Sequence, residues 1–180
     1  MTEKEIIAGC LKKNGVYQRM LFDLYSRKLM SLCLRYAGSS PEAEDMLQES
    51  LLKIFSSIQQ YEHKGSFEGW IKKITVNTCL RKIERKNIFT DGLAVLENTS
   101  DEHWEDIISS MTEKELISLI GKLPEGYRAV FNLYVMEGYS HNEIAEMLKI
   151  EPVTSRSQLI KARRMLQKQI LVSQKTTQET

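Results

Sequence analysis

The sequence is poor in the residues that interrupt or cross-link a polypeptide chain. Its 180 residues include only 9 glycines, 3 prolines and 3 cysteines. Cys10, Cys33 and Cys79 are far apart and odd in number, so the sequence predicts neither a disulfide framework nor a zinc site. The scarcity of glycine and proline, together with long stretches in which apolar residues recur with the helical period, predicts an all-α protein.

Membrane and secretion signals are also lacking. No apolar run is long enough to span a bilayer, and Met1–Gly9 has no signal-peptide pattern. We therefore expect the protein in the cytoplasm.

Residue sets that indicate catalysis or metal binding are missing as well. The histidines His63, His103 and His141 are scattered, and the stretch HNEIA at His141 is not the HExxH of a zinc enzyme. The sequence has no Glu-x-x-His pair, no Ser/His/Asp set and no phosphate-binding glycine loop. We predict no catalytic residue, no metal site and no cofactor, and we expect the histidines on the surface or in helix caps.

Charge is balanced in number but not in position. The 25 Lys and Arg residues oppose 24 Asp and Glu residues, which gives a formal net charge of +1. The segment 90–110 contains acidic residues and no Lys or Arg, and its Gly, Asn, Thr and Ser residues disfavour regular structure. This pattern predicts two small helical domains, residues 1–88 and 111–172, joined by a flexible acidic linker at 89–110. Residues 173–180 are expected to fray as a polar tail.

Four helices are expected before the linker. A short helix within 1–14 ends at Gly15, a second spans 16–37, and a third runs from Pro41 to about Gln60 with acidic residues in its first turns. A fourth begins at Ser66 and is crowded with Lys and Arg, after a loop that bears aromatic residues. Cations beside aromatic rings are typical of single-stranded nucleic-acid binding, whereas the alternative interpretation keeps Phe67 and Trp70 in the core.

The stretch 140–166 has the layout of a helix-turn-helix. Ser140 and Glu143 are placed as a capping box for one helix, and Pro152 suits the start of the next. The second helix is predicted to bury Val153, Leu159, Ala162 and Leu166. Its other face carries Thr154, Arg156, Gln158, Lys161, Arg163 and Arg164. Such a helix can lie in the DNA major groove, and an amphipathic hairpin with a solvated basic face is the alternative.

Together these motifs resemble a bacterial RNA polymerase sigma factor of the compact extracytoplasmic-function (ECF) type. EAEDMLQESLLKIF, residues 42–55, resembles the acidic helix of sigma region two, and F..WI..I..N from Phe67 to Asn77, followed by Arg81 and Arg85, resembles its promoter-melting segment. LPEGYRAVFNLYVMEGYSHNEIAEMLKI, residues 123–150, and the basic helix after it resemble region four. The resemblance covers nearly the whole chain in two blocks, about 17–86 and 111–171.

The resemblance implies three binding surfaces. Docking on the core polymerase would use Asp45, Gln48, Glu49, Leu51 and Phe55. The minus-ten promoter element would be read and held open by Tyr61, Phe67, Trp70, Lys73, Asn77, Arg81 and Arg85. The minus-thirty-five element would face Thr154, Ser155, Arg156, Ser157, Gln158, Lys161, Arg163 and Arg164. In this last set Arg156 and Gln158 suit the edges of guanine and adenine, and Arg163 and Arg164 suit phosphate.

The implied function is that of a promoter-specificity subunit without catalysis of its own. Its partners would be core RNA polymerase, promoter DNA and an anti-sigma factor, without membrane insertion. Two departures from the family pattern put the preferred minus-thirty-five sequence in doubt: Val153 replaces a frequent glycine, and Gln158 replaces a frequent arginine. A stand-alone helix-turn-helix regulator is the second hypothesis, but it gives no reason for the basic helix at 67–86.

Overall fold

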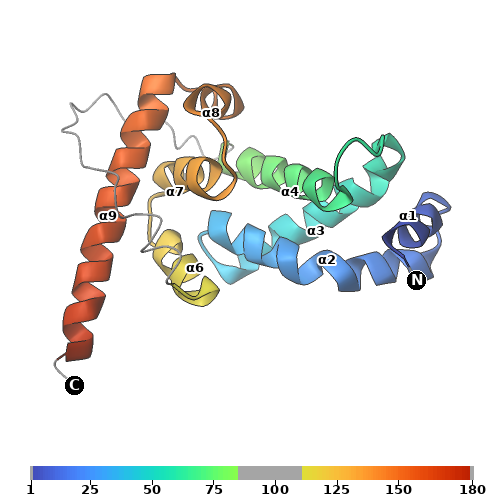
Figure 1. The fold of residues 1–180 in the computed structure, drawn as a ribbon, viewed down its shortest axis with the longest axis horizontal. Helices are drawn as coiled ribbons and strands as arrows, with labels where there is room; N and C mark the ends of the chain where they lie inside the picture. The colour runs from blue at the N-terminus through green and yellow to red at the C-terminus, as the bar shows by residue number, and fades with distance from the viewer. Residues whose placement is uncertain (1, 85–110, 179–180) are drawn as a thin grey trace. The chain divides into compact units, whose positions relative to one another are not determined.

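The computed structural model describes residues 2–84 and 111–178, and within these ranges all regular structure is helical (Figure 1). The chain divides into two compact units, unit 1 (Met1–Lys82) and unit 2 (Ile83–Thr180). The predicted all-α class is therefore confirmed. The predicted linker at 89–110 lies outside the described residues, so the domain boundaries proposed from the sequence stay a prediction.

Unit 1 consists of four α-helices and one short 3-10 turn. They are α1 (Glu3–Leu11), α2 (Gly15–Tyr36), α3 (Ser40–Ser57), η1 (Ile58–Gln60) and α4 (Phe67–Glu84). Helix α2 packs against both α1 and α3. The third helix is thus close to its predicted bounds, with a 3-10 turn in place of its last residues.

Side-chain caps determine where the first helices of unit 1 begin. Thr2 and Glu5 form a capping box for α1, and the backbone N–H of Val16 donates to Asn14 Oδ1 at 3.0 Å at the start of α2. The prediction that Gly15 ends the first helix is wrong. Helix α1 ends at Leu11, because the chain turns through a left-handed residue at Lys13 (φ 54°) and Asn14 then caps a new helix that begins at Gly15.

The core of unit 1 is built from apolar residues that α1 to α4 and η1 contribute. Leu21, Ile54 and Ile71 have no exposed surface, and Phe67 has 1%. Cys33 and Cys79, which are distant in sequence, are both fully buried. Their thiols share a hydrogen bond, which together with burial raises the pKa of Cys79 well above its usual value. Both are free thiols, so they act here as small core residues.

Unit 2 contains the remaining helices. They are α6 (Glu113–Gly121), α7 (Glu125–Phe131), the π-helical turn η2 (Asn132–Met136), α8 (His141–Leu148) and α9 (Pro152–Gln178). The predicted capping box is confirmed at Ser140–Glu143 for α8, and Thr112 and Glu115 form a second capping box for α6. Helix α9 continues to Gln178, and the expected fraying of the polar tail at 173–180 stays a prediction.

Helices α8 and α9 form the predicted helix-turn-helix, and the turn between them contains no glycine. Lys149, the C-cap of α8, takes the left-handed conformation (φ 55°, ψ 45°), and the Ile150 N–H donates to the Ala145 carbonyl at 3.1 Å. Helix α9 packs against α6, α7 and α8. Leu159, Ala162 and Leu166 are buried as predicted, but Val153, in the first turn of α9, is 45% exposed.

Candidate nucleic-acid interface

The first turns of α9 present the side chains that are best placed to meet duplex DNA. Arg156 is exposed, and Thr154, in the first turn of the helix, is partly exposed. Two basic residues farther along α9 lie over aromatic rings. Lys161 Nζ is 5.7 Å from the ring centroid of Tyr127, and Arg163 Cζ is 6.0 Å from that of Tyr134. These cation–π contacts hold the charges on the surface of unit 2.

Three predicted DNA-facing residues of α9 point inward instead. Ser155 is fully buried, Ser157 is 5% exposed and Gln158 is 2% exposed. The expectation that Gln158 lies on the open face is wrong. Because α9 packs against three other helices, its buried face is wider than its apolar stripe. The hydroxyl of Ser157 accordingly donates to the Thr154 carbonyl at 2.9 Å rather than facing solvent.

His141 and Tyr134 join this surface without having been predicted to. The two rings stack at 4.5 Å between centroids with an interplanar angle of 20°, and His141 Nδ1 lies 2.8 Å from Ser155 Oγ. Burial lowers the pKa of His141, and the nearby charges of Arg156 and Arg163 lower it further. The sequence offered only the position of His141 directly after the N-cap, which does not indicate stacking partners contributed by other elements.

On α4, one open face carries the predicted minus-ten cations. Lys73, Asn77 and Arg81 are exposed and follow one another at a spacing of four, so they share one face of the helix. Arg81 Nε donates to the Asn77 carbonyl at 3.4 Å. The predicted contact Arg85 lies outside the described residues.

The aromatic residues near the start of α4 are packed together. Phe67 stacks on Trp70 at 5.6 Å between centroids (29°), and Tyr61 lies 5.1 Å from Phe67 and 5.5 Å from Trp70. Phe67 is 1% exposed, so its predicted DNA contact is corrected to a core role. Tyr61 and Trp70 are only partly buried, which leaves both rings some open surface.

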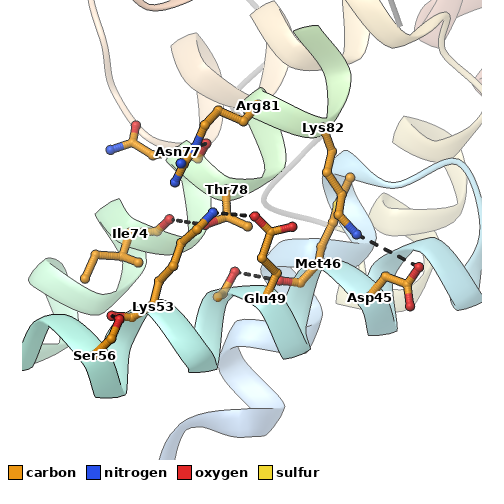
Figure 2. A network of polar contacts seen from close by, with 11 residues as sticks. Asp45, Met46, Glu49, Lys53, Ser56, Ile74, Asn77, Thr78, Arg81 and Lys82 are labelled. Carbon is orange, nitrogen blue, oxygen red and sulfur yellow. Dashed lines mark hydrogen bonds and ion pairs between the residues drawn. The ribbon is translucent and has the colours of Figure 1, made fainter. Parts of the chain in front are cut away.

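The acidic face of α3 adjoins the basic helix α4 (Figure 2). Lys53 Nζ lies 2.5 Å from Glu49 Oε1 and 3.3 Å from Thr78 Oγ1, so it joins the two helices. Asp45 Oδ2 is 4.0 Å from Lys82 Nζ at the other end of the seam. The predicted docking acids and the predicted minus-ten residues thus occupy neighbouring helices of one unit.

One apolar docking residue was placed wrongly. Leu51 is 7% exposed and belongs to the core, whereas the next residue, Leu52, is 71% exposed. Gln48 is exposed four residues before Leu52, and Phe55 is partly exposed three residues after it. The leucine on the outer face of α3 is therefore Leu52 and not Leu51.

The arrangement provides charge and flat rings rather than reactive groups. In the described part of the chain, no three or more His, Cys, Asp or Glu side chains gather as metal ligands. No described helix is long and apolar enough to cross a membrane. Unit 1 offers exposed cations on α4 next to an acidic and apolar face on α3, and unit 2 offers exposed cations on α9.

Comparison with protein families assigns both units. Residues 21–88 match the family model for sigma-70 region 2, and residues 113–166 match that for sigma-70 region 4. The ECF RNA polymerase sigma-E factor of Haemophilus influenzae is 27% identical over 182 residues, which cover 94% of this chain and 96% of that protein. The ECF sigma factor SigW of Bacillus subtilis is 28% identical over 162 residues, which cover 83% and 87%.

Two further similarities are more limited. The ECF sigma factor SigE of Mycolicibacterium smegmatis is 28% identical over 79% of this chain, but the match covers 57% of that protein. Among solved structures, CnrH in complex with the cytosolic domain of CnrY has a TM-score of 0.50 at 16% identity, covering 94% of this chain and 97% of that chain. At this identity the likeness concerns the fold alone.

Proposed function

This chain belongs to the sigma-70 family as an ECF-type sigma factor, and on that basis we propose a division of work between its two units. Unit 1 docks on core RNA polymerase and opens the minus-ten element, and unit 2 binds the minus-thirty-five element. The observation that carries this proposal is that each unit presents its own exposed cations, on α4 and on α9, and that each matches a different sigma region.

For the minus-thirty-five element, we assign base reading to Arg156. Its guanidinium is exposed near the N-terminus of α9, the end that a recognition helix offers to base edges, and a guanidinium can bond guanine in a bidentate manner. Thr154, in the first turn of α9, is partly exposed as well. Lys161, Arg163 and Arg164 are assigned to phosphates. The burial of Ser155, Ser157 and Gln158 argues for a supporting role in place of base contacts.

For the minus-ten element, we assign Lys73, Asn77 and Arg81 to the opened strand. Their common face can follow a phosphate backbone, and the partly exposed rings of Tyr61 and Trp70 can stack on unpaired bases. Extruding a base costs a few kcal/mol, which such stacking and phosphate contacts offset.

For polymerase docking, we assign Asp45, Gln48, Glu49, Leu52 and Phe55 on the outer face of α3. An exposed leucine among carboxylates suits a partner surface that is basic and partly apolar. The chain with a similar fold was solved with the cytosolic domain of CnrY. We propose by analogy that a regulatory anti-sigma protein also binds this chain, and we place the chain in the cytoplasm with the polymerase.

The proposal is tested by mixing the purified chain with core polymerase and measuring run-off transcription. A sigma factor should direct promoter-dependent transcripts and bind free duplex poorly. A stand-alone regulator should instead bind a palindromic duplex without polymerase and direct no initiation, and this outcome would overturn the proposal.

The docking face is tested separately with the double variant Asp45→Ala and Gln48→Ala. Both side chains are exposed, so the fold should persist while affinity for core polymerase falls. Glu146→Ala, which removes another exposed acid on α8, is the matched control and should retain affinity. Normal binding by a well-folded double variant would move the docking surface elsewhere.

A further inference from the structure

His141 is the first residue of α8 and contacts the first turn of α9, and the assignments above do not use it. Its ring lies against Tyr134 of η2, and its Nδ1 is fixed by Ser155 of α9. Within the described residues, its other nitrogen, Nε2, has no hydrogen-bond partner. The ring is therefore oriented by two elements while one nitrogen stays available to a ligand.

The charged groups around His141 are predominantly positive. Helix α9 contributes Arg156 and Arg163, and η2 contributes the neutral Tyr134, over whose ring Arg163 lies. On α8 itself, the carboxylate of Glu143 is turned back onto the hydroxyl and N–H of Ser140 in the capping box. A partly buried imidazole near two guanidinium groups favours the neutral form, and an anion placed near these groups would reverse that preference.

We propose that His141, together with Arg163, binds a phosphate of the promoter backbone beside the minus-thirty-five element, and that its imidazole takes up a proton as the DNA binds. This inference rests on the proposed function, because it requires unit 2 to meet that element. Ser155 is the positioning residue: its hydroxyl holds Nδ1, so that Nε2–H can donate to a phosphate oxygen.

The sign of the pH effect follows from the two states of the histidine. In the free chain, burial and then Arg156 and Arg163 keep the pKa of His141 below its usual value. In the complex, the phosphate offsets both guanidinium charges and attracts the imidazolium, so the pKa rises. The bound state then holds more protons than the free state, and affinity increases as the pH falls through this range.

The direct test is an NMR titration of the full-length chain with labelled histidine, alone and with excess duplex carrying the minus-thirty-five element. The pKa of His141 should be higher with the duplex. A duplex whose phosphates at that site are replaced by neutral methylphosphonates should bind more weakly and leave the pKa near its value in the free chain. Saturated binding of the unmodified duplex with an unchanged His141 pKa would overturn the inference.

A second test uses the holoenzyme and follows its affinity for the same duplex between about pH 6 and about pH 8, where histidine is the main titrating side chain. Between the higher and the lower pH, the affinity of the wild type should rise about threefold more than that of His141→Asn, which cannot take up the proton. His63→Asn, in unit 1, is the matched control and should keep the wild-type profile. Identical profiles for His141→Asn and the wild type would contradict the inference. A holoenzyme that ignores the element at every pH would overturn the proposed function as well.

Discussion

Glu68 is the side chain that most clearly ties α4 to the rest of unit 1. Its carboxylate lies 2.8 Å from Lys28 Nζ on α2 and 2.9 Å from Lys72 Nζ one turn farther along α4. Hydrogen bonds from these two lysines lower its pKa to about 2. Because the folded-state pKa is depressed, Glu68 stabilises the fold above its ordinary pKa, and this contribution is lost as the pH falls through about 4 toward about 2.

We expect Glu68→Gln to lower the free energy of unfolding of the chain by about 1 kcal/mol at neutral pH. The expected loss is this small because both lysines are partly exposed and solvent screens their ion pairs with Glu68. The difference from the wild type should shrink as the pH is lowered through the same range. Chemical denaturation followed by tryptophan fluorescence would measure it.

The matched control for this prediction is Glu62→Gln. Glu62 pairs with Lys64 at side-chain exposures of 67% and 84%, so its removal should change stability by less than about 0.5 kcal/mol. Equal losses in the two variants, or a loss for Glu68→Gln that is constant down to the lowest pH, would contradict the role given to Glu68.

The sequence predicted the exposure of a single residue correctly where polar or charged side chains face solvent, and incorrectly where a polar side chain is buried. Arg156, Asn77 and Arg81 were predicted to be exposed, and they are. Gln158 was predicted to be exposed because it is polar, but it is buried. The width of the packed face of α9 depends on tertiary contacts with other helices, which the local sequence pattern does not indicate. The stacking of His141 on Tyr134 escaped prediction for the same reason.

Within the elements, helix starts were predictable because caps are local chemistry. The capping box of α8 was placed correctly from spacing alone. The π-helical turn at Asn132–Met136 was not, since it continues α7 without a glycine or proline to mark it. Asn132 there is fully buried, which a helical pattern of apolar residues does not anticipate.

Helix α3 offers a sharp test, because its two adjacent leucines face opposite ways. Leu52→Ala should weaken binding to core polymerase by about tenfold, equivalent to about 1.4 kcal/mol, and leave stability nearly unchanged. Leu51→Ala should instead lower the free energy of unfolding by about 2–4 kcal/mol, because it empties a buried site. Denaturation and a binding titration on both variants would measure the two effects.

The two leucine variants serve as controls for one another. If Leu52→Ala bound the core enzyme as tightly as the wild type, the docking face would have to be assigned without it. If Leu51→Ala weakened binding while its stability stayed intact, the assignment of Leu51 to the core would be contradicted.

For the molecule as a whole, the existence of two helical units was predictable from the order of the motifs and from the change in composition between them. Each unit folds around its own apolar cluster, and each places a basic helix at its surface. We therefore expect promoter choice to be separable into two parts, one read by α4 and the other by α9.

The most direct measurement is run-off transcription by the holoenzyme on promoters in which the minus-ten and minus-thirty-five elements are substituted one at a time. With Arg156→Ala, the penalty for a substituted minus-thirty-five base pair, normally about 1–3 kcal/mol, should vanish at the contacted position while the minus-ten penalty is kept. With Asn77→Ala, the reverse should hold. If Arg156→Ala and Asn77→Ala each reduced discrimination at both elements equally, or at neither, the division of promoter recognition between the two units would be contradicted.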